Sequence, residues 1–131
     1  MGFSSLAFKV LTADTSDNLF IIGHHNLTPG AGPALHLHYV QEEWFYVMKG
    51  EVVLLVGEQR LHHRTGESVL EPRRIPYTFS AVGSSAHMLI ALTPAGKMEQ
   101  YFIDASAETS IPATAGFMSR YEMQWIGPSP F

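Results

Sequence analysis

Short apolar runs recur along this chain at intervals of roughly ten residues, and turn-forming residues separate one run from the next. Such spacing is typical of antiparallel sandwiches and barrels, and no strong helical periodicity precedes residue 104. The sequence therefore predicts an all-β fold. We expect strands near residues 6–11, 19–27, 34–39, 43–49, 51–56, 59–63, 68–71, 77–81, 87–93 and 99–103.

Chain length and composition predict one domain over residues 1–131, with a barrel core of about 18–104 and a tail of 105–131. Apolar residues make up 46% of the chain, with eight Phe and five Tyr, which is enough for a packed core. The tail is small and polar near its start, and its later part is expected to be a short helix or an extended segment.

Charge and cysteine content exclude several classes of function. The net charge is −4 and the eight Lys and Arg are scattered, so neither nucleic acid nor an anionic membrane is an expected partner. No apolar run approaches the roughly 18 residues that span a bilayer. The absence of Cys excludes disulfides and thiolate metal ligands. A cytoplasmic protein is the expectation.

The segment from Gly30 to Gly50 holds the residues that carry chemistry. His36 and His38 are separated by one residue, so on a strand their side chains point to the same side. Glu43 opens the next apolar run, and a tight turn brings it back beside the two histidines. Two imidazoles and a carboxylate are the ligand set of mononuclear iron oxygenases and also suit zinc, nickel or manganese.

Blander interpretations of these residues stay open at this point. The histidines fit a surface strand, and Glu43 fits a solvated strand end beside Glu42. If Glu43 instead points inward, Phe45 and Val47 do so as well and give the pocket an apolar wall. An unpaired carboxylate there is costly unless coordination or a hydrogen bond relieves the cost.

The same segment resembles the first motif of the cupin superfamily: Gly, five residues, His-x-His, four residues, Glu, six residues, Gly. Gly30, His36, His38, Glu43 and Gly50 fill every specified position. The second cupin motif is similar to Gly66–Phe79, but it departs at two places. Arg74 stands where a Gly is usual, and Tyr77 stands where the last histidine ligand is usual.

The resemblance to cupins extends beyond the two motifs. Residues 93–102 look like the strand that closes small cupins, and residues 120–128 are similar to the tail of a quercetin-dioxygenase-like group. It implies a double-stranded β-helix, a jelly-roll barrel with the site inside. By position it implies His36, His38 and Glu43 as ligands of one divalent transition metal, namely Fe, Ni, Mn or Zn.

Tyr77 has three interpretations. Its phenol ligates a ferric ion as a phenolate, or stays protonated and hydrogen-bonds a bound water, oxygen molecule or substrate, or fills space with its hydroxyl on Glu43. Phe45, Val47 and Phe79 are expected to be core residues that also line a ligand cavity. His24 and His25 fit a surface or a dimer interface, and His87 is a further candidate for the missing imidazole.

The first functional hypothesis is a metal-dependent dioxygenase acting on a small aromatic or enolisable compound, with Glu43 as the base and Tyr77 as a second catalytic residue. Isomerase or lyase chemistry fits the same residues. The alternative is a non-catalytic barrel that binds or senses a small ligand with a weakened or absent metal site. A homodimer is expected, with the apolar run Leu19–Ile22 as a suitable surface.

Overall fold

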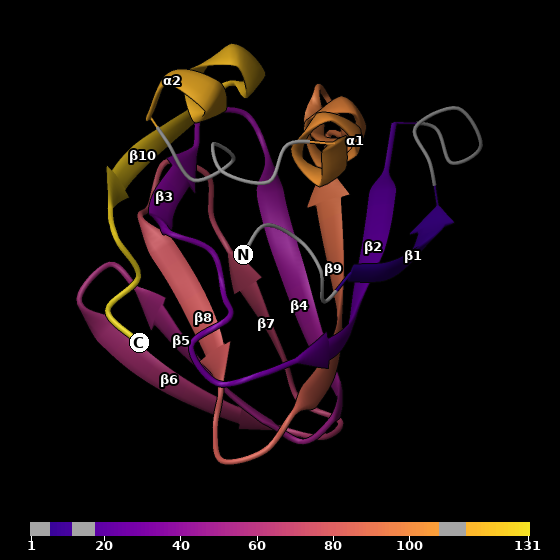
Figure 1. Ribbon diagram of the computed structural model, residues 1–131, viewed down its shortest axis with the longest axis vertical. Helices are drawn as coiled ribbons and strands as arrows, with labels where there is room; N and C mark the ends of the chain where they lie inside the picture. The colour runs from indigo at the N-terminus through magenta and orange to yellow at the C-terminus, as the bar shows by residue number, and fades with distance from the viewer. Residues whose placement is uncertain (1–5, 12–17, 108–114) are drawn as a thin grey trace.

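Two five-stranded antiparallel sheets make up the described part of the molecule (Figure 1). The computed structural model describes residues 6–11, 18–107 and 115–131. The elements in chain order are β1 (Leu6–Leu11), β2 (Phe20–Leu27), β3 (Leu35–His38), β4 (Glu42–Lys49), β5 (Glu51–Val56), β6 (Gln59–Arg64), β7 (Ser68–Glu71), β8 (Tyr77–Ala81), β9 (Ala86–Thr93), α1 (Met98–Ala107), α2 (Ala115–Met118), a 3-10 turn (Ser119–Tyr121) and β10 (Met123–Gly127).

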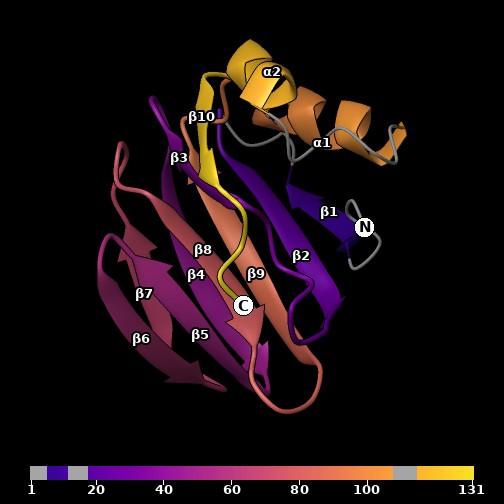
Figure 2. The same cartoon turned by 60° about the vertical axis from the view of Figure 1, so that its left-hand side comes forward.

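The two sheets face each other, as in a jelly roll. One has the strand order β1-β2-β9-β4-β7, and the other has the order β10-β3-β8-β5-β6. Several neighbouring strands are distant in sequence: β9 pairs with both β2 and β4, and β8 pairs with both β3 and β5. Figure 2 shows α1 and α2 together at one end of the sheets. The expected all-β, double-stranded β-helix architecture is confirmed, although the sheets do not join into a closed barrel.

Alternating side chains from both sheets fill the space between them. On β9, Ala86, Met88, Ile90 and Leu92 are buried while the residues between them are more exposed. This alternation is what a strand with one buried face requires, because successive side chains point to opposite faces. Nine of the ten predicted strands appear within one residue of their expected bounds.

The tenth predicted strand is wrong, because residues 99–103 lie inside helix α1. The run Glu-Gln-Tyr-Phe-Ile is rich in residues that favour strands. Met98, Tyr101 and Ala105, however, are all at most 2% exposed, and their spacing of three and four residues places them on one face of a helix. Packing of that face against the end of the sheets decides the structure.

The C-terminal segment supplies a strand as well as a helix. β10 pairs antiparallel with β3, with Met123 opposite His38 and Trp125 opposite His36. The predicted tail is therefore part of the second sheet over residues 123–127, whereas residues 108–114 lie outside the described residues. The strand that closes this side of the fold is β10 rather than residues 93–102.

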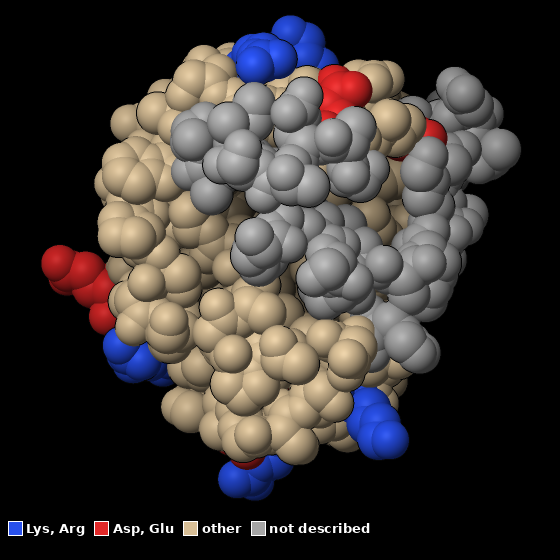
Figure 3. Space-filling view, in the orientation of Figure 1, with Lys and Arg blue, Asp and Glu red and all other residues tan. Residues whose placement is uncertain are grey.

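The surface shown in Figure 3 carries few charged side chains, and its Lys and Arg lie apart near the rim. Phe20 and Ile22, from the run expected to form a dimer surface, are buried within the chain at 0% and 3% exposure. That part of the expected dimer surface is wrong. In the ranges that the structure describes, no helix combines the length and the hydropathy needed to cross a membrane.

Candidate metal and ligand site

Strands from both sheets bring the predicted site residues into one buried layer. β3 supplies His36 and His38, and β8 places Tyr77 directly opposite His36. β4, in the other sheet, supplies Glu43. All four side chains are 3% exposed. The interpretation of the histidines and Glu43 as solvated surface groups is therefore wrong.

His36 is held in the tautomer that suits coordination. Its Nδ1 lies 2.6 Å from the carbonyl oxygen of Ala34, which accepts but cannot donate. Burial, reinforced by His38, lowers the pKa of His36 from 6.5 to about 4, so the ring is neutral near pH 7. The proton therefore sits on Nδ1 and the lone pair on Nε2, an arrangement typical of metal-binding histidines.

His38, Glu43 and Tyr77 form a hydrogen-bonded cluster. Nε2 of His38 lies 3.2 Å from Oε1 of Glu43 and 3.2 Å from the hydroxyl oxygen of Tyr77. Burial by itself raises the pKa of Glu43, but His38 and the hydrogen bonds from His38 and Tyr77 outweigh it and lower that pKa. Glu43 is therefore ionised and accepts hydrogen bonds from both neighbours.

The phenol of Tyr77 is protonated in this arrangement. Burial, followed by the charges of Glu43 and Glu71, raises the pKa of Tyr77 well above 10. Its hydroxyl donates to Glu43, which is the third of the interpretations given above. The second interpretation, in which the hydroxyl donates to a bound ligand, stays a prediction.

Two further buried polar residues belong to this layer, and the sequence did not single them out. Glu71 on β7 is directly opposite Glu43 and is 2% exposed. Burial, with the charge of Glu43, raises the pKa of Glu71 to about 8. Gln41 is 1% exposed, and neither Nε2 nor Oε1 of its amide has a hydrogen-bond partner among the described residues.

The alternation of inward and outward residues along each strand could have identified Glu71 and Gln41 as inward-pointing. Val69 and Glu71 are the more buried residues of β7, and Gln41 continues the inward alternation of Glu43 and Phe45. What the sequence lacked was the pairing of β4 with β7, which brings the two carboxylates face to face.

An apolar layer lies beside these polar groups. Phe45, Val47 and Phe79, the residues predicted to line a pocket, are at most 2% exposed. The ring of Phe45 lies 5.6 Å from that of Tyr77 and 5.6 Å from that of Phe79, measured between centroids. His24 packs edge-on to Phe79 at 5.5 Å and is 5% exposed. The surface or interface location expected for His24 is therefore wrong.

Helix α1 covers the end of the sheets nearest the site. Tyr101 on α1 is 2% exposed, and the charge of Glu43 adds to burial in raising the pKa of Tyr101. The ring of Tyr101 contacts those of Phe117 and Tyr121 at centroid distances of 5.6 Å and 5.3 Å. These aromatic rings keep bulk water away from the polar layer.

Two other candidates are not in the site. His87 lies on the outward side of β9, because its neighbours Ala86 and Met88 are the buried ones, so it does not replace the missing imidazole. Arg74 is exposed and its φ is 69°, in the left-handed region where glycine is favoured. This explains why the cupin motif has a glycine at the position of Arg74.

The donors fit a divalent transition metal in type, and His36 and Glu43 also fit it in proton state. His36 presents a lone pair on Nε2, and Oε2 of Glu43 is buried without a hydrogen-bond partner among the described residues. Their arrangement is that of a hydrogen-bonded cluster, since no three His, Asp or Glu side chains in the described ranges are grouped as a metal would need. The agreement with a metal site therefore lies in the chemical type of the donor residues, which share one buried layer, and not in their present arrangement.

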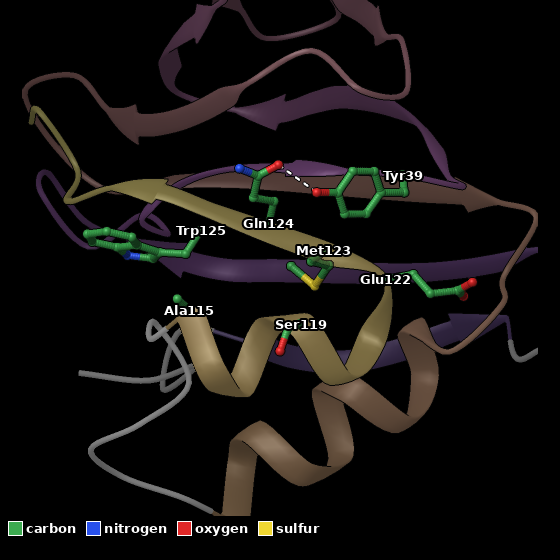
Figure 4. Close-up of a pocket in the computed structure, with 7 residues that line it drawn as sticks. All are labelled: Tyr39, Ala115, Ser119, Glu122, Met123, Gln124 and Trp125. Atoms are coloured by element: carbon green, nitrogen blue, oxygen red, sulfur yellow. Dashed lines mark hydrogen bonds between the residues drawn. The ribbon is translucent and has the colours of Figure 1, made fainter.

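A surface pocket of about 490 Å³ lies between β10 and α2 (Figure 4). Trp125 and Met123 give it apolar walls, and the hydroxyl of Tyr39 donates a hydrogen bond of 2.6 Å to Oε1 of Gln124. None of the predicted metal ligands lines this pocket. The buried titratable groups of the candidate site therefore lie outside this pocket.

The chain belongs to the cupin family: residues 23–93, more than half of its length, match the Cupin domain. Among curated proteins, none matches this sequence. The family assignment covers both motifs, from β2 to the end of β9.

Solved structures of low sequence identity share the fold. KdgF from Halomonas sp. has a TM-score of 0.59 at 15% identity, covering 66% of this chain and 76% of its own. The EutQ protein of Clostridium difficile has a TM-score of 0.57 at 18% identity, covering 67% and 66%. A cupin-2 domain containing protein from Shewanella frigidimarina has a TM-score of 0.54 at 17% identity, covering 64% and 78%.

Proposed function

We propose that this cupin binds one divalent transition metal through His36, His38 and Glu43 and holds a small molecule beside it. The observation that carries this proposal is the buried layer in which both imidazoles and the carboxylate meet at 3% exposure. Iron, nickel, manganese and zinc all suit these donors. Oε2 of Glu43 is buried without a hydrogen-bond partner among the described residues, which is costly, and a cation offsets that cost.

Dioxygenase-type oxidation of a small aromatic or enolisable compound is the reaction that we assign to the site. A bound divalent ion supplies Lewis-acid and redox chemistry at its open positions. Glu43 is an ionised carboxylate that accepts hydrogen bonds from His38 and Tyr77, so it is suited to accept a proton from a substrate hydroxyl. Tyr77 donates a hydrogen bond to substrate oxygen, and the rings of Phe45 and Phe79 contact an aromatic substrate.

A second candidate is a non-catalytic cupin that binds or senses a small ligand. One observation favours it: the donors of Glu43 and His38 are engaged with each other and with Tyr77, which stands where a histidine ligand is usual. This arrangement is expected to weaken metal binding. The two sheets and the apolar layer between them, which could hold a small ligand, do not depend on the metal.

Metal analysis of the protein purified without added metal tests the proposal. We expect close to one equivalent of a transition metal per chain, and its loss in His36→Ala and His38→Ala variants. His62→Ala, at an exposed position on β6, is the matched control and should keep the metal. Metal-loaded protein is then tested for oxygen uptake with phenols, flavonols and diketones.

The outcomes separate the candidates. Oxygen uptake that is lost with the metal supports the dioxygenase. Bound metal without uptake on any of these substrates favours the binding protein. Wild-type protein that holds no transition metal, even after incubation with each of the four ions, contradicts the metal site itself.

A further inference from the structure

Glu71 is a buried carboxylate that neither cupin motif accounts for. It ends β7 immediately before Pro72, and it pairs with Glu43 across β4 and β7. Residues directly opposite each other in an antiparallel pair project from the same face, with Cβ atoms about 5 Å apart. The side chain of Glu71 is therefore a neighbour of Glu43 in the same layer as the two histidines.

The two carboxylates have no lysine or arginine beside them in the described part of the chain, and His38 is the basic residue that contacts Glu43. No Lys or Arg there forms an ion pair with Glu43 or Glu71, whose side chains are 3% and 2% exposed. Each also has one buried oxygen without a hydrogen-bond partner, Oε2 of Glu43 and Oε1 of Glu71. Two adjacent buried carboxylates are costly, and a divalent cation relieves that cost for both.

We propose that Glu71 is a fourth protein ligand of the metal, supplying the donor that Tyr77 does not supply in the place of the usual last histidine. This inference rests on the metal site proposed above. Glu71 is directly opposite Glu43, and Glu43 accepts a hydrogen bond from Tyr77, so Glu71 adjoins the cluster that contains the residue standing where the histidine is missing. Two imidazoles and two carboxylates balance the charge of a divalent ion and shift the donor set towards oxygen, which suits manganese and iron.

The test compares Glu71→Gln with wild type, using metal alone as the probe. The protein is stripped with a chelator and titrated with Mn²⁺ and with Co²⁺, whose visible absorption reports its ligands. We expect Glu71→Gln to bind both ions about 10-fold more weakly or worse, and its Co²⁺ spectrum to change. Glu58→Gln removes the same charge at an exposed turn and should match wild type in affinity and spectrum.

Each outcome has one meaning. Wild type that binds neither ion overturns the proposed metal site and this inference with it. Wild-type binding with equal affinity in Glu71→Gln overturns this inference and leaves the metal site standing. Weaker binding with an unchanged Co²⁺ spectrum also overturns it, because Glu71 would then act only through its charge.

Circular dichroism shows whether Glu71→Gln is folded. A second variant keeps the test decisive if it is not. Glu71→Asp keeps the charge but shortens the side chain by one methylene. Coordination by Glu71 predicts weaker binding and an altered Co²⁺ spectrum for this variant. An Asp variant that matches wild type in both respects contradicts coordination.

Discussion

Tyr77 is the residue that separates this chain from the usual cupin ligand pattern. Its hydroxyl bridges the two donors contributed by His38 and Glu43, while its ring lies 4.6 Å from that of His36. A phenol held in this way stabilises the metal-free cluster.

Tyr77→Phe removes the hydroxyl and keeps the ring. A hydrogen bond to a charged group contributes roughly 1.5–3 kcal/mol, so we expect metal-free Tyr77→Phe to lose about that much unfolding free energy in urea. Metal affinity should be retained or increased, because Glu43 and His38 lose a competitor. Abolished metal binding in Tyr77→Phe would instead assign Tyr77 as a ligand.

Gly32 is a second residue with a specific requirement. It lies in the connection between β2 and β3, and a Cβ there would overlap the carbonyl oxygen of Phe79 on β8. The added Cβ is fixed to the backbone, and the carbonyl oxygen of Phe79 is part of it. The overlap can therefore be removed only if the β2–β3 connection moves away from β8.

Gly32→Ala is therefore expected to lower the unfolding free energy by roughly 2 kcal/mol or more. Gly116→Ala is the matched control, since a Cβ at Gly116 in α2 meets nothing within 4 Å. The control should be neutral or slightly stabilising, as expected for Gly to Ala in a helix. Equal stability of Gly32→Ala and wild type in chemical denaturation contradicts this contact.

At the scale of elements, strand positions followed from the sequence because each run is bounded by turn residues. Glycines 50, 57, 66 and 83 all adopt positive φ at or beside the turns where hairpins were expected. Residues 99–103, which lie inside α1, were predicted as strand because their aromatic run outweighed the helical spacing of Met98, Tyr101 and Ala105. Helix α1 forms because it packs over the ends of the sheets, and this tertiary contact cannot be predicted from local secondary-structure propensity.

The shared buried layer of the predicted site residues follows from their spacing within one segment, and their role as metal ligands stays a prediction. His36, His38 and Glu43 lie within eight positions, so strand periodicity and one turn were enough to bring them together. Glu71 and Gln41 required knowledge of which strands pair and of what covers the end of the sheets. The buried position of His24 was also missed. β2 lies between β1 and β9, and the His24 side chain packs against Phe79 of the other sheet.

At the scale of the whole molecule, the two sheets and the helical cap make a water-poor interior that favours neutral imidazoles. Burial lowers the pKa of His24 from 6.5 to about 4, with Glu43 opposing the shift, and lowers that of His36 to a similar value. As pH falls below 6.5 the unfolded chain takes up protons before the fold does. Stability present above pH 6.5 is therefore lost on the way down through pH 4.

His24→Gln removes one of these groups without adding a charge. Between pH 7.5 and 4.5 we expect metal-free wild type to lose about 2–3 kcal/mol more unfolding free energy than His24→Gln. Urea denaturation at the two pH values gives this difference directly. Parallel pH dependence in the two proteins would show that His24 is not held neutral by burial.

Anomalous X-ray diffraction from crystals grown with Mn²⁺ or Zn²⁺ tests most directly whether the buried layer holds a metal. We predict one anomalous peak per chain, about 2.0–2.2 Å from Nε2 of His36, Nε2 of His38 and a carboxylate oxygen of Glu43. Crystals that contain the ion in the mother liquor but show no peak between the two sheets, with Glu43 still hydrogen-bonded to His38 and Tyr77, would contradict the proposal.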